Sequence, residues 1–513
     1  MLVRVDSSAI LGVDAYVVEV EVDVAIGVSS FTVVGLPDAA VKESGERVRA
    51  AIRNTGYDFP WSKRLTINLA PADIKKVGPI YDLPIAVGIL AASGQVSREF
   101  LDDMMVVGEL SLDGTVRSVH GVLPMALAAR DNGKKYLIVP EENTREAAVV
   151  DGISVYPVAS LTDVMGLMED IGSKEPAHVD VSSFALDRPR YDLDFAEVKG
   201  QEHVKRALEV AAAGGHNILM IGPPGSGKTM LARRIPGILP PMNLAEALET
   251  TKLFSVSGRL DSSAALVTTR PFRSPHHTIS NAGLSGGGTY PQPGEVSLAH
   301  HGVLFLDELP EFRRDVLEIL RQPLEDGQVT ISRVAGTLTY PARFMLIAAM
   351  NPCPCGFASD PTRPCTCNPG MINKYLQRIS GPLLDRIDIH IEVPRLKDQE
   401  LVNVPTGETS EAIRVRVERA RETQRLRFEG NGAGIFCNAH MGAKQIRQVC
   451  APNDDVKDLL KTAINNLNLS ARAYDRILKL ARTIADLEGV EDIVLAHVAE
   501  AVQYRSLDRK LWG

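Results

Sequence analysis

The chain has 513 residues, of which 45% are hydrophobic and only 5% aromatic. This length exceeds what one hydrophobic core usually holds, so we expect two or three domains. The formal net charge of −8 excludes a protein that coats nucleic acid over its whole surface, but it permits a local basic groove. No stretch reaches the roughly 18 apolar residues of a membrane span, and the first residues lack the pattern of a signal peptide. We therefore expect a cytoplasmic protein without a membrane partner.

The first 172 residues alternate between strand and helix patterns. Val18–Val24 alternates valine with acidic residues, which predicts a half-buried strand within Val13–Val34. The later patterns predict a helix, a strand, a helix, a strand, a helix and a strand. In chain order these are Asp38–Asn54, Arg64–Leu69, Asp82–Ala92, Val106–Leu112, Val122–Asn132 and Tyr136–Val139.

A polar, proline-containing stretch over residues 173–194 is the predicted linker. Residues 195–396 form a second α/β block, and residues 397–513 are predicted to be helical. The predicted helices of this last region are Glu411–Phe428, Val456–Leu467, Ser470–Leu487 and Ile493–Tyr504.

A glycine-rich loop follows the first buried strand of the second block. Ile218–Ile221 leads into a G-x-x-x-x-G-K-T pattern, in which backbone N–H groups curl around phosphates and the following helix adds positive potential. We expect Lys228 to reach the β- and γ-phosphates of ATP and Thr229 to hold Mg²⁺; a chance glycine-rich turn is the alternative. The loop consists of Gly222, Pro223, Pro224, Gly225, Ser226, Gly227, Lys228 and Thr229.

Two more apolar runs end in polar residues. Val303–Leu306 leads into Asp307 and Glu308, which we expect to bind Mg²⁺ and to polarise the attacking water as general base, respectively. Phe344–Met350 leads into Asn351. An amide at the end of that strand can orient the water or the γ-phosphate; the alternative is that Asn351 only begins a turn.

The order of these motifs resembles the AAA+ superfamily, in the branch of magnesium chelatases, MoxR proteins and minichromosome-maintenance helicases. Asp194–Gln201 is similar to the segment that packs against the adenine in that superfamily. The resemblance implies that Asn351 is sensor 1 and that Arg472 is sensor 2. It also implies that Arg386 is an arginine finger, which reaches the ATP of a neighbouring subunit and so requires a ring, a homo-hexamer. Surface ion pairs are the alternative for both arginines.

Two insertions are typical of this branch. Arg273–Gly294 is a Gly/Pro/Ser-rich excursion, and Gln328–Tyr340 predicts a β-hairpin with Arg333 near its tip. In the helicases that the chain resembles, the equivalent segments face a central pore and track DNA. Arg333 is therefore the first candidate for a DNA phosphate contact, with an ordinary solvated arginine as the alternative. The adjacent His276 and His277 have no partner spacing that would predict a metal site.

Four cysteines form two C-x-C pairs around a loop rich in proline, glycine and aspartate. Because Zn²⁺ prefers a tetrahedron of soft ligands, the pattern predicts a structural zinc site. The C-x-C spacing is tighter than the commoner C-x-x-C, and reduced thiols or a redox pair are the alternatives. The four residues are Cys353, Cys355, Cys365 and Cys367.

The N-terminal region resembles the proteolytic domain of Lon over Val107–Arg117, Gly121–Gly133 and Leu137–Asn143. Lon uses a Ser–Lys dyad, in which the Lys helps to deprotonate the Ser. The segment that matches its nucleophile, Gly78–Pro84, contains no Ser, and the position of the Lys falls near Leu123. The resemblance implies a degenerate α+β domain over residues 1–172 that binds or regulates.

The Lon-like domain, the AAA+ P-loop core, the cysteine cluster and the helical C-terminal lid together resemble the YifB/ComM family over essentially the whole chain. That resemblance implies a hexameric, ATP-driven DNA translocase or helicase that acts on single-stranded or branched DNA. Its implied role is branch migration in homologous recombination and natural transformation. The alternative is a magnesium-chelatase-type or MoxR-type ATPase that remodels a protein partner.

Overall fold

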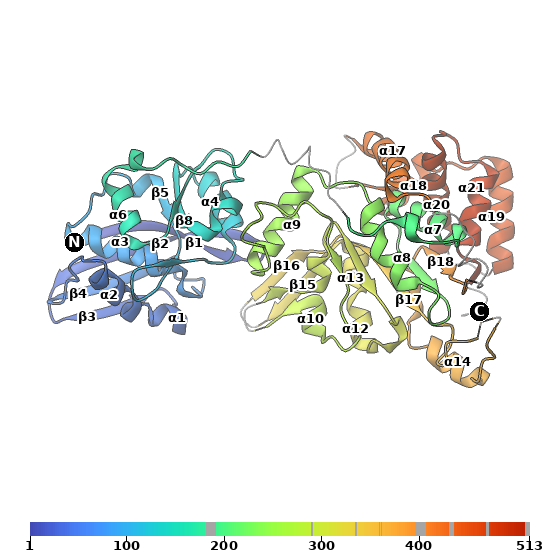
Figure 1. Cartoon of the computed structure of the whole chain (residues 1–513), viewed down its shortest axis with the longest axis horizontal. Helices are drawn as coiled ribbons and strands as arrows, with labels where there is room; N and C mark the ends of the chain where they lie inside the picture. Colours follow the sequence, from blue (N-terminus) through green and yellow to red (C-terminus); the bar gives the residue numbers. More distant parts are fainter. Residues whose placement is uncertain are drawn as a thin grey trace. The chain divides into compact units, whose positions relative to one another are not determined.

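The computed structural model describes residues 1–180, 191–288, 291–333, 336–358, 360, 362–396, 407–429, 435–467 and 471–507. The chain divides into two compact units, and each is built from two stretches of sequence (Figure 1). Unit 1 consists of Met1–Asp187 and Asn243–Thr268, and unit 2 of Arg188–Met242 and Thr269–Gly513.

Unit 1 is built on a mixed seven-stranded sheet of order β3-β4-β2-β1-β5-β8-β9. The two longest strands, β1 and β2, pair antiparallel, and β5, β8 and β9 continue the sheet with parallel neighbours. The strands are β1 (Leu2–Leu11), β2 (Asp14–Ile26), β3 (Ser30–Val34), β4 (Lys63–Ala70), β5 (Met104–Val106), β8 (Tyr136–Pro140) and β9 (Ser154–Val158).

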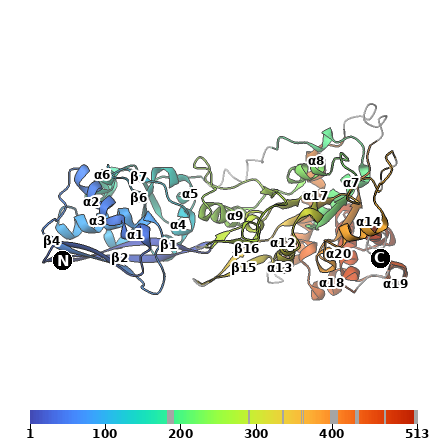
Figure 2. The ribbon, with the colours of Figure 1, turned by 90° about the horizontal axis from the view of Figure 1, so that it is seen from below.

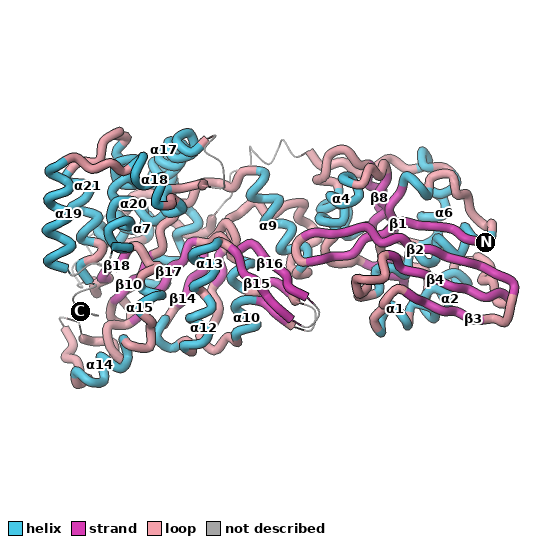
Figure 3. The backbone as a smooth tube through the Cα atoms, turned by 180° about the vertical axis from the view of Figure 1, so that it is seen from behind, coloured by secondary structure: helices cyan, strands magenta, loops and turns pink. Residues whose placement is uncertain are grey.

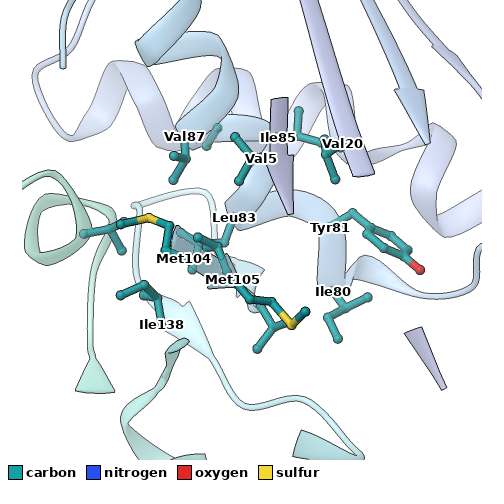
Figure 4. Packing of buried hydrophobic residues seen from close by; sticks show 14 of the residues in the cluster. Val5, Val20, Ile80, Tyr81, Leu83, Ile85, Val87, Met104, Met105 and Ile138 are labelled. Atoms are coloured by element: carbon teal, nitrogen blue, oxygen red, sulfur yellow. The ribbon is translucent and has the colours of Figure 1, made fainter. Parts of the chain in front are cut away.

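The core of unit 1 lies between this sheet and its helices. The valines of β2 at positions 18, 20, 22 and 24 are buried, and the acidic residues between them are half-buried, so the predicted alternation is confirmed. Helices α3 (Asp82–Ser93) and α4 (Val122–Asp131) pack against β1 and β2. Figure 2 shows these helices with α2 (Ser44–Asn54) on one side of the sheet, and Figure 4 shows buried hydrophobic side chains of this core.

Several predicted elements of unit 1 differ from the structure. Strand β1 was not predicted, because the buried polar pair Ser7 and Ser8 hides its apolar pattern. The helix expected over Asp38–Asn54 is divided at Glu43 into α1 (Ala39–Lys42) and α2. The strand expected over Val106–Leu112 is also wrong: the chain leaves the sheet after Val106, and β6 (Glu109–Leu110) pairs with β7 (Val116–Arg117) instead.

The segment Asn243–Thr268 comes from the stretch expected to form the ATPase core, yet it packs within unit 1. Its helix α9 (Leu244–Val256) contacts α4. Gly121 at the start of α4 donates its N–H to the carbonyl of Ser255 at 3.1 Å, and the hydroxyl of Ser255 donates to the buried carboxyl of Glu146. The sequence does not predict this packing, because it depends on partners more than a hundred residues away.

Unit 2 is built on a parallel five-stranded sheet of order β11-β14-β17-β10-β18. Every residue of β10, β14 and β17 is buried, as expected for parallel strands covered on both faces. Ligands bind such sheets beyond the carboxyl ends of the strands. The strands are β10 (Ile218–Ile221), β11 (Phe272–Arg273), β14 (Val303–Leu306), β17 (Met345–Met350) and β18 (Ile389–Glu392).

The C-terminal part of unit 2 is helical, and the four predicted helices are confirmed with small shifts of their ends. A fifth, α18, was missed because it is short and buries only Ile446. No helix in the described ranges combines the length and the apolar character needed to cross a membrane. The helices are α17 (Ser410–Phe428), α18 (Ala443–Val449), α19 (Asp454–Leu467), α20 (Ala471–Glu488) and α21 (Leu495–Gln503).

A buried charge cluster joins α20 to the parallel sheet. Asp388, just before β18, lies 3.2 Å from Nδ1 of the fully buried His216 and 3.3 Å from Nε of Arg476 on α20. Burial alone would raise the pKa of Asp388, but His216 and Arg476 outweigh it and hold the pKa well below its usual value. The resulting stabilisation is present above the unfolded-state pKa of about 3.9 and is lost as the pH falls below it.

Replacing Asp388 with Asn should therefore destabilise unit 2 by about 3–5 kcal/mol, because the fully buried His216 and the largely buried Arg476 lose their counter-charge. Urea unfolding followed by circular dichroism measures the change. Asp458→Asn is the matched control: its partner Lys461 is 3.1 Å away and both side chains are more than 70% exposed, so the loss should stay below about 1 kcal/mol. Equal shifts for the two variants would contradict the prediction.

Candidate functional site

The phosphate-binding loop leaves β10 at Gly222 and enters α8 (Lys228–Arg234). A Cβ on Gly222 would lie 2.1 Å from the carbonyl oxygen of Val393, so only glycine fits where the loop passes β18. Gly227, with φ of +90°, turns the chain into α8, a conformation that glycine adopts without strain. The sequence pattern thus has a direct steric cause.

Lys228 lies folded into this loop. Its Nζ donates to the carbonyl oxygens of Gly222 at 2.7 Å and Pro223 at 2.9 Å. Burial lowers the pKa of Lys228 to about 8, and the carboxylates of Asp307 and Glu308 only partly oppose that effect. An ammonium held in this way, surrounded by carbonyl oxygens, is suited to an anionic phosphate as its stronger partner.

Thr229 and Asp307 meet at the ends of neighbouring elements. The Thr229 hydroxyl donates to Oδ2 of Asp307 at 2.6 Å. A hydroxyl and a carboxylate are oxygen ligands of the kind that Mg²⁺ accepts together with phosphate oxygens and water. The two side chains therefore fit the predicted Mg²⁺ position.

Glu308 stands beside Asp307 in a left-handed backbone conformation, with φ of +53°. Its N–H donates to Oδ1 of Asp307 at 3.0 Å, and its own side chain is 56% exposed. The turn thus sends one carboxylate towards Thr229 and leaves the other accessible, as a general base requires.

His277 is a site residue that the sequence interpretation missed. Its Nδ1 lies 3.5 Å from Oε2 of Glu308, although the sequence offered no partner for either histidine of the pair. The signal is in the topology: β11 pairs with β14 through Arg273 and Leu304, so residues that follow the two strands emerge at the same edge of the sheet. His277 therefore contacts the candidate base.

Asn351 follows β17, which lies between β10 and β14 in the sheet. Its Oδ1 accepts a hydrogen bond from Nζ of Lys228 at 3.4 Å. The structure thus brings Lys228, Thr229, Asp307, Glu308 and Asn351 to one edge of the parallel sheet.

The two predicted arginines lie elsewhere. Arg386 follows α15 (Gly381–Leu384), forms an ion pair with Glu325 of α13 (Arg321–Asp326), and has a side chain that is 11% exposed. Within the described ranges, its Nε has no hydrogen-bond partner. Arg472 is exposed in the first turn of α20, and no described contact joins it to the phosphate loop. The roles of both arginines stay predictions.

The predicted hairpin over Gln328–Tyr340 is present as β15 (Gln328–Arg333) and β16 (Gly336–Pro341) (Figure 3). The register of the two strands places Arg333 opposite Gly336. The hairpin lies against the other insertion: the Tyr340 hydroxyl donates to the carbonyl of Pro291 at 2.6 Å. Arg333 is exposed, and among the described residues its side chain donates one hydrogen bond, from Nη1 to the neighbouring Ser332 carbonyl. Its guanidinium is therefore accessible to a ligand.

The four clustered cysteines converge. The Sγ of Cys353 lies 3.3 Å from that of Cys355 and 3.7 Å from that of Cys365, and all four sulfurs, including Cys367, lie within 4.8 Å of one another. A Zn–S bond of 2.3 Å gives tetrahedral S···S edges of about 3.8 Å, close to these distances. Four thiol sulfurs at these separations are a donor set that fits Zn²⁺.

Comparison with known proteins extends along the whole chain. Residues 194–401 match the family model of magnesium chelatase, subunit ChlI; residues 20–143 match that of subunit ChlI of Mg-chelatase, and residues 407–505 its C-terminal model. Competence protein ComM of Haemophilus influenzae is 47% identical over 513 residues, covering 99% of this chain and 98% of that protein. YifB of Escherichia coli is 45% identical over 509 residues, covering 99% and 97%. The chain belongs to the ComM/YifB family.

This ComM/YifB chain also has a relative that matches only its N-terminal part. Lon protease 2 of Bacillus subtilis is 29% identical over 144 residues, covering 28% of this chain and 25% of that protein. The chain is therefore a magnesium-chelatase-type AAA+ protein with a Lon-like N-terminal region and a helical C-terminal region, as predicted.

In this family member, the positions that match the Lon dyad hold other chemistry. Asp82 of the Gly78–Pro84 segment is buried and accepts hydrogen bonds from Arg47 at 2.6 and 3.0 Å. Burial raises the pKa of Asp82 to about 6, although Arg47 opposes the shift. Leu123, near the position expected for the Lys, is fully buried. The Gly78–Pro84 segment and Leu123 therefore do not supply the Ser and Lys of the Lon dyad.

Proposed function

We propose that this chain is an ATP-driven DNA translocase or helicase that promotes branch migration in homologous recombination and natural transformation. The observation that carries the proposal is Arg333, an exposed cation on a hairpin that lies in the sequence between β14, which is followed by Asp307 and Glu308, and β17, which is followed by Asn351. The hairpin is thus connected through the backbone to both strands whose ends carry the candidate catalytic residues. Full-length similarity to a competence protein supports the same conclusion.

The ATP chemistry follows from the residues at the sheet edge. Lys228 binds the phosphates with the loop N–H groups, and Thr229 and Asp307 hold Mg²⁺, which supplies charge neutralisation. Glu308 accepts the proton of the attacking water, and Asn351 orients that water or the γ-phosphate.

The proposed assembly is a homo-hexamer in the cytoplasm. Arg386 would exchange Glu325 for the ATP of the adjacent subunit, because its unpartnered Nε leaves donor capacity that a phosphate can use. Arg472 would approach the nucleotide from the helical lid. The four clustered cysteines would hold one structural Zn²⁺ as reduced thiolates, in keeping with a reducing compartment.

ATP hydrolysis should rise several-fold when single-stranded or branched DNA is added, and phosphate release measures this effect. Arg333→Ala should reduce the stimulation and lower the salt dependence of DNA binding by about 0.7–0.9 in log–log slope for each lost phosphate contact. Arg447→Ala, which removes an exposed arginine of α18, should retain both.

The opposite result is equally clear. Hydrolysis that is unchanged by every DNA, together with no DNA retention at low salt, would contradict the proposal. It would favour an ATPase that remodels a protein partner.

A further inference from the structure

The cysteine cluster lies directly against the phosphate loop. Gly356 follows Cys355, and a Cβ on Gly356 would lie 2.6 Å from Cδ and 2.7 Å from Cγ of Pro224. Its N–H donates to the carbonyl of Cys353 at 3.0 Å, which closes a tight turn. With φ of +87°, this turn places glycine backbone against Pro224 of the loop predicted to bind phosphate.

The same turn also adjoins Asn351. A Cβ on Gly356 would lie 3.9 Å from Cγ of Asn351, and only Pro352 separates Asn351 from Cys353 in the chain. Asn351 in turn accepts the hydrogen bond from Lys228. The cysteine turn therefore contacts both the phosphate loop and the amide that faces it.

The segment that carries this turn has no regular secondary structure among its described residues. It runs between Asn351 and Asn368, and most of its described residues are half-buried or exposed. Ordering each residue of such a segment costs about 1–2 kcal/mol of conformational entropy. Besides the Arg363 guanidinium on the Phe357 ring and the hydrogen bond from the Thr362 hydroxyl to Asp360, the described side chains of this segment converge at the group of four sulfurs.

We propose that one Zn²⁺ bound by Cys353, Cys355, Cys365 and Cys367 holds the Gly356 turn against Pro224, so that nucleotide binding depends on a metal outside the Mg–ATP site. The inference rests on the proposed zinc site and adds its effect on the phosphate loop. Loss of the metal releases the turn, which leaves the loop and Asn351 without their support.

The test uses the full-length protein, purified without chelator. Elemental analysis should find about one zinc per chain, and titration with a fluorescent ATP analogue and Mg²⁺ gives the Kd. Cys353→Ala should lose the zinc and weaken nucleotide binding about tenfold, as should treatment of the wild type with a chelator that does not take up Mg²⁺. Cys450→Ala, which truncates another fully buried thiol of unit 2, should keep both zinc and affinity.

Gly356→Ala tests how the turn affects nucleotide binding while the four metal ligands stay intact. All four thiols remain, so zinc should stay bound, but the added methyl group pushes the turn away from Pro224 and should weaken nucleotide binding to a similar extent. Gly370→Ala is the control, because a Cβ there meets nothing closer than 3.4 Å.

The outcomes distinguish the two parts of the inference. Wild-type protein without zinc overturns the metal site itself. Zinc that is present, and lost on chelation without any change in Kd, overturns the coupling while the site stands. Should Cys353→Ala fail to fold, the chelated wild type and Gly356→Ala decide the result.

Discussion

Replacing Glu308 with Gln should slow ATP turnover by about 10²–10⁴-fold while the protein still binds ATP. The amide has the shape of the carboxylate but cannot accept the proton of the attacking water. The hydrogen bond between Thr229 and Asp307 and the contacts of Lys228 do not involve the Glu308 side chain. The nucleotide should therefore be held without being hydrolysed, as filter binding and steady-state phosphate release would show.

Lys228→Ala provides the contrast. It removes the ammonium that the loop carbonyls surround, so both binding and hydrolysis should be lost. If Glu308→Gln hydrolyses ATP at the wild-type rate, the base lies elsewhere, and His277, at 3.5 Å from Glu308, is the next residue to replace.

Arg386→Ala should reduce turnover by about 10³-fold or more, the range measured when a transition-state arginine is removed. Within one chain the arginine is paired with Glu325 and does not contact Lys228 or Asn351, so its effect on hydrolysis requires a neighbouring subunit. Mixing Arg386→Ala with Lys228→Ala subunits should restore part of the activity, because one combination unites an intact loop with an intact arginine.

Glu325→Gln separates this role from that of an ordinary ion pair. If the ion pair between Arg386 and Glu325 only stabilises the fold, Glu325→Gln and Arg386→Ala should lower activity and thermal stability to the same degree. If Arg386 acts on the adjacent site, Arg386→Ala should be far more damaging to turnover than Glu325→Gln. Mixed subunits with no recovered activity would contradict action between subunits.

The elements that the sequence predicts well are those with local causes. The loop from Gly222 to Thr229 needs glycine for steric reasons, and β10, β14 and β17 are apolar throughout because both faces are covered. The same holds for β2, whose valines alternate with solvated acids. In each case neighbouring residues along the chain carry the pattern.

The features that were missed depend on distant partners. His277 reaches Glu308 only because β11 and β14 are neighbours in the sheet, and Arg386 meets Glu325 across 61 positions. Strand β1 carries Ser7 and Ser8 in its centre, and these interrupt its apolar alternation. Its place in the sheet is fixed by antiparallel pairing with β2. Such contacts produce no periodic pattern in the sequence, because the spatial order of the strands and helices brings the residues together.

Because Asn243–Thr268 belongs to unit 1, the backbone passes between the two units three times. A protease that cuts between Asp180 and Tyr191 would therefore nick the chain without releasing the Lon-like part. A truncated protein that starts at Tyr191 would keep α9 but lose its packing surface, so that Leu253 and Val256, both buried here, would face water. Such a fragment should be prone to aggregation. A truncation that respects the domain boundary must remove both stretches of unit 1 together.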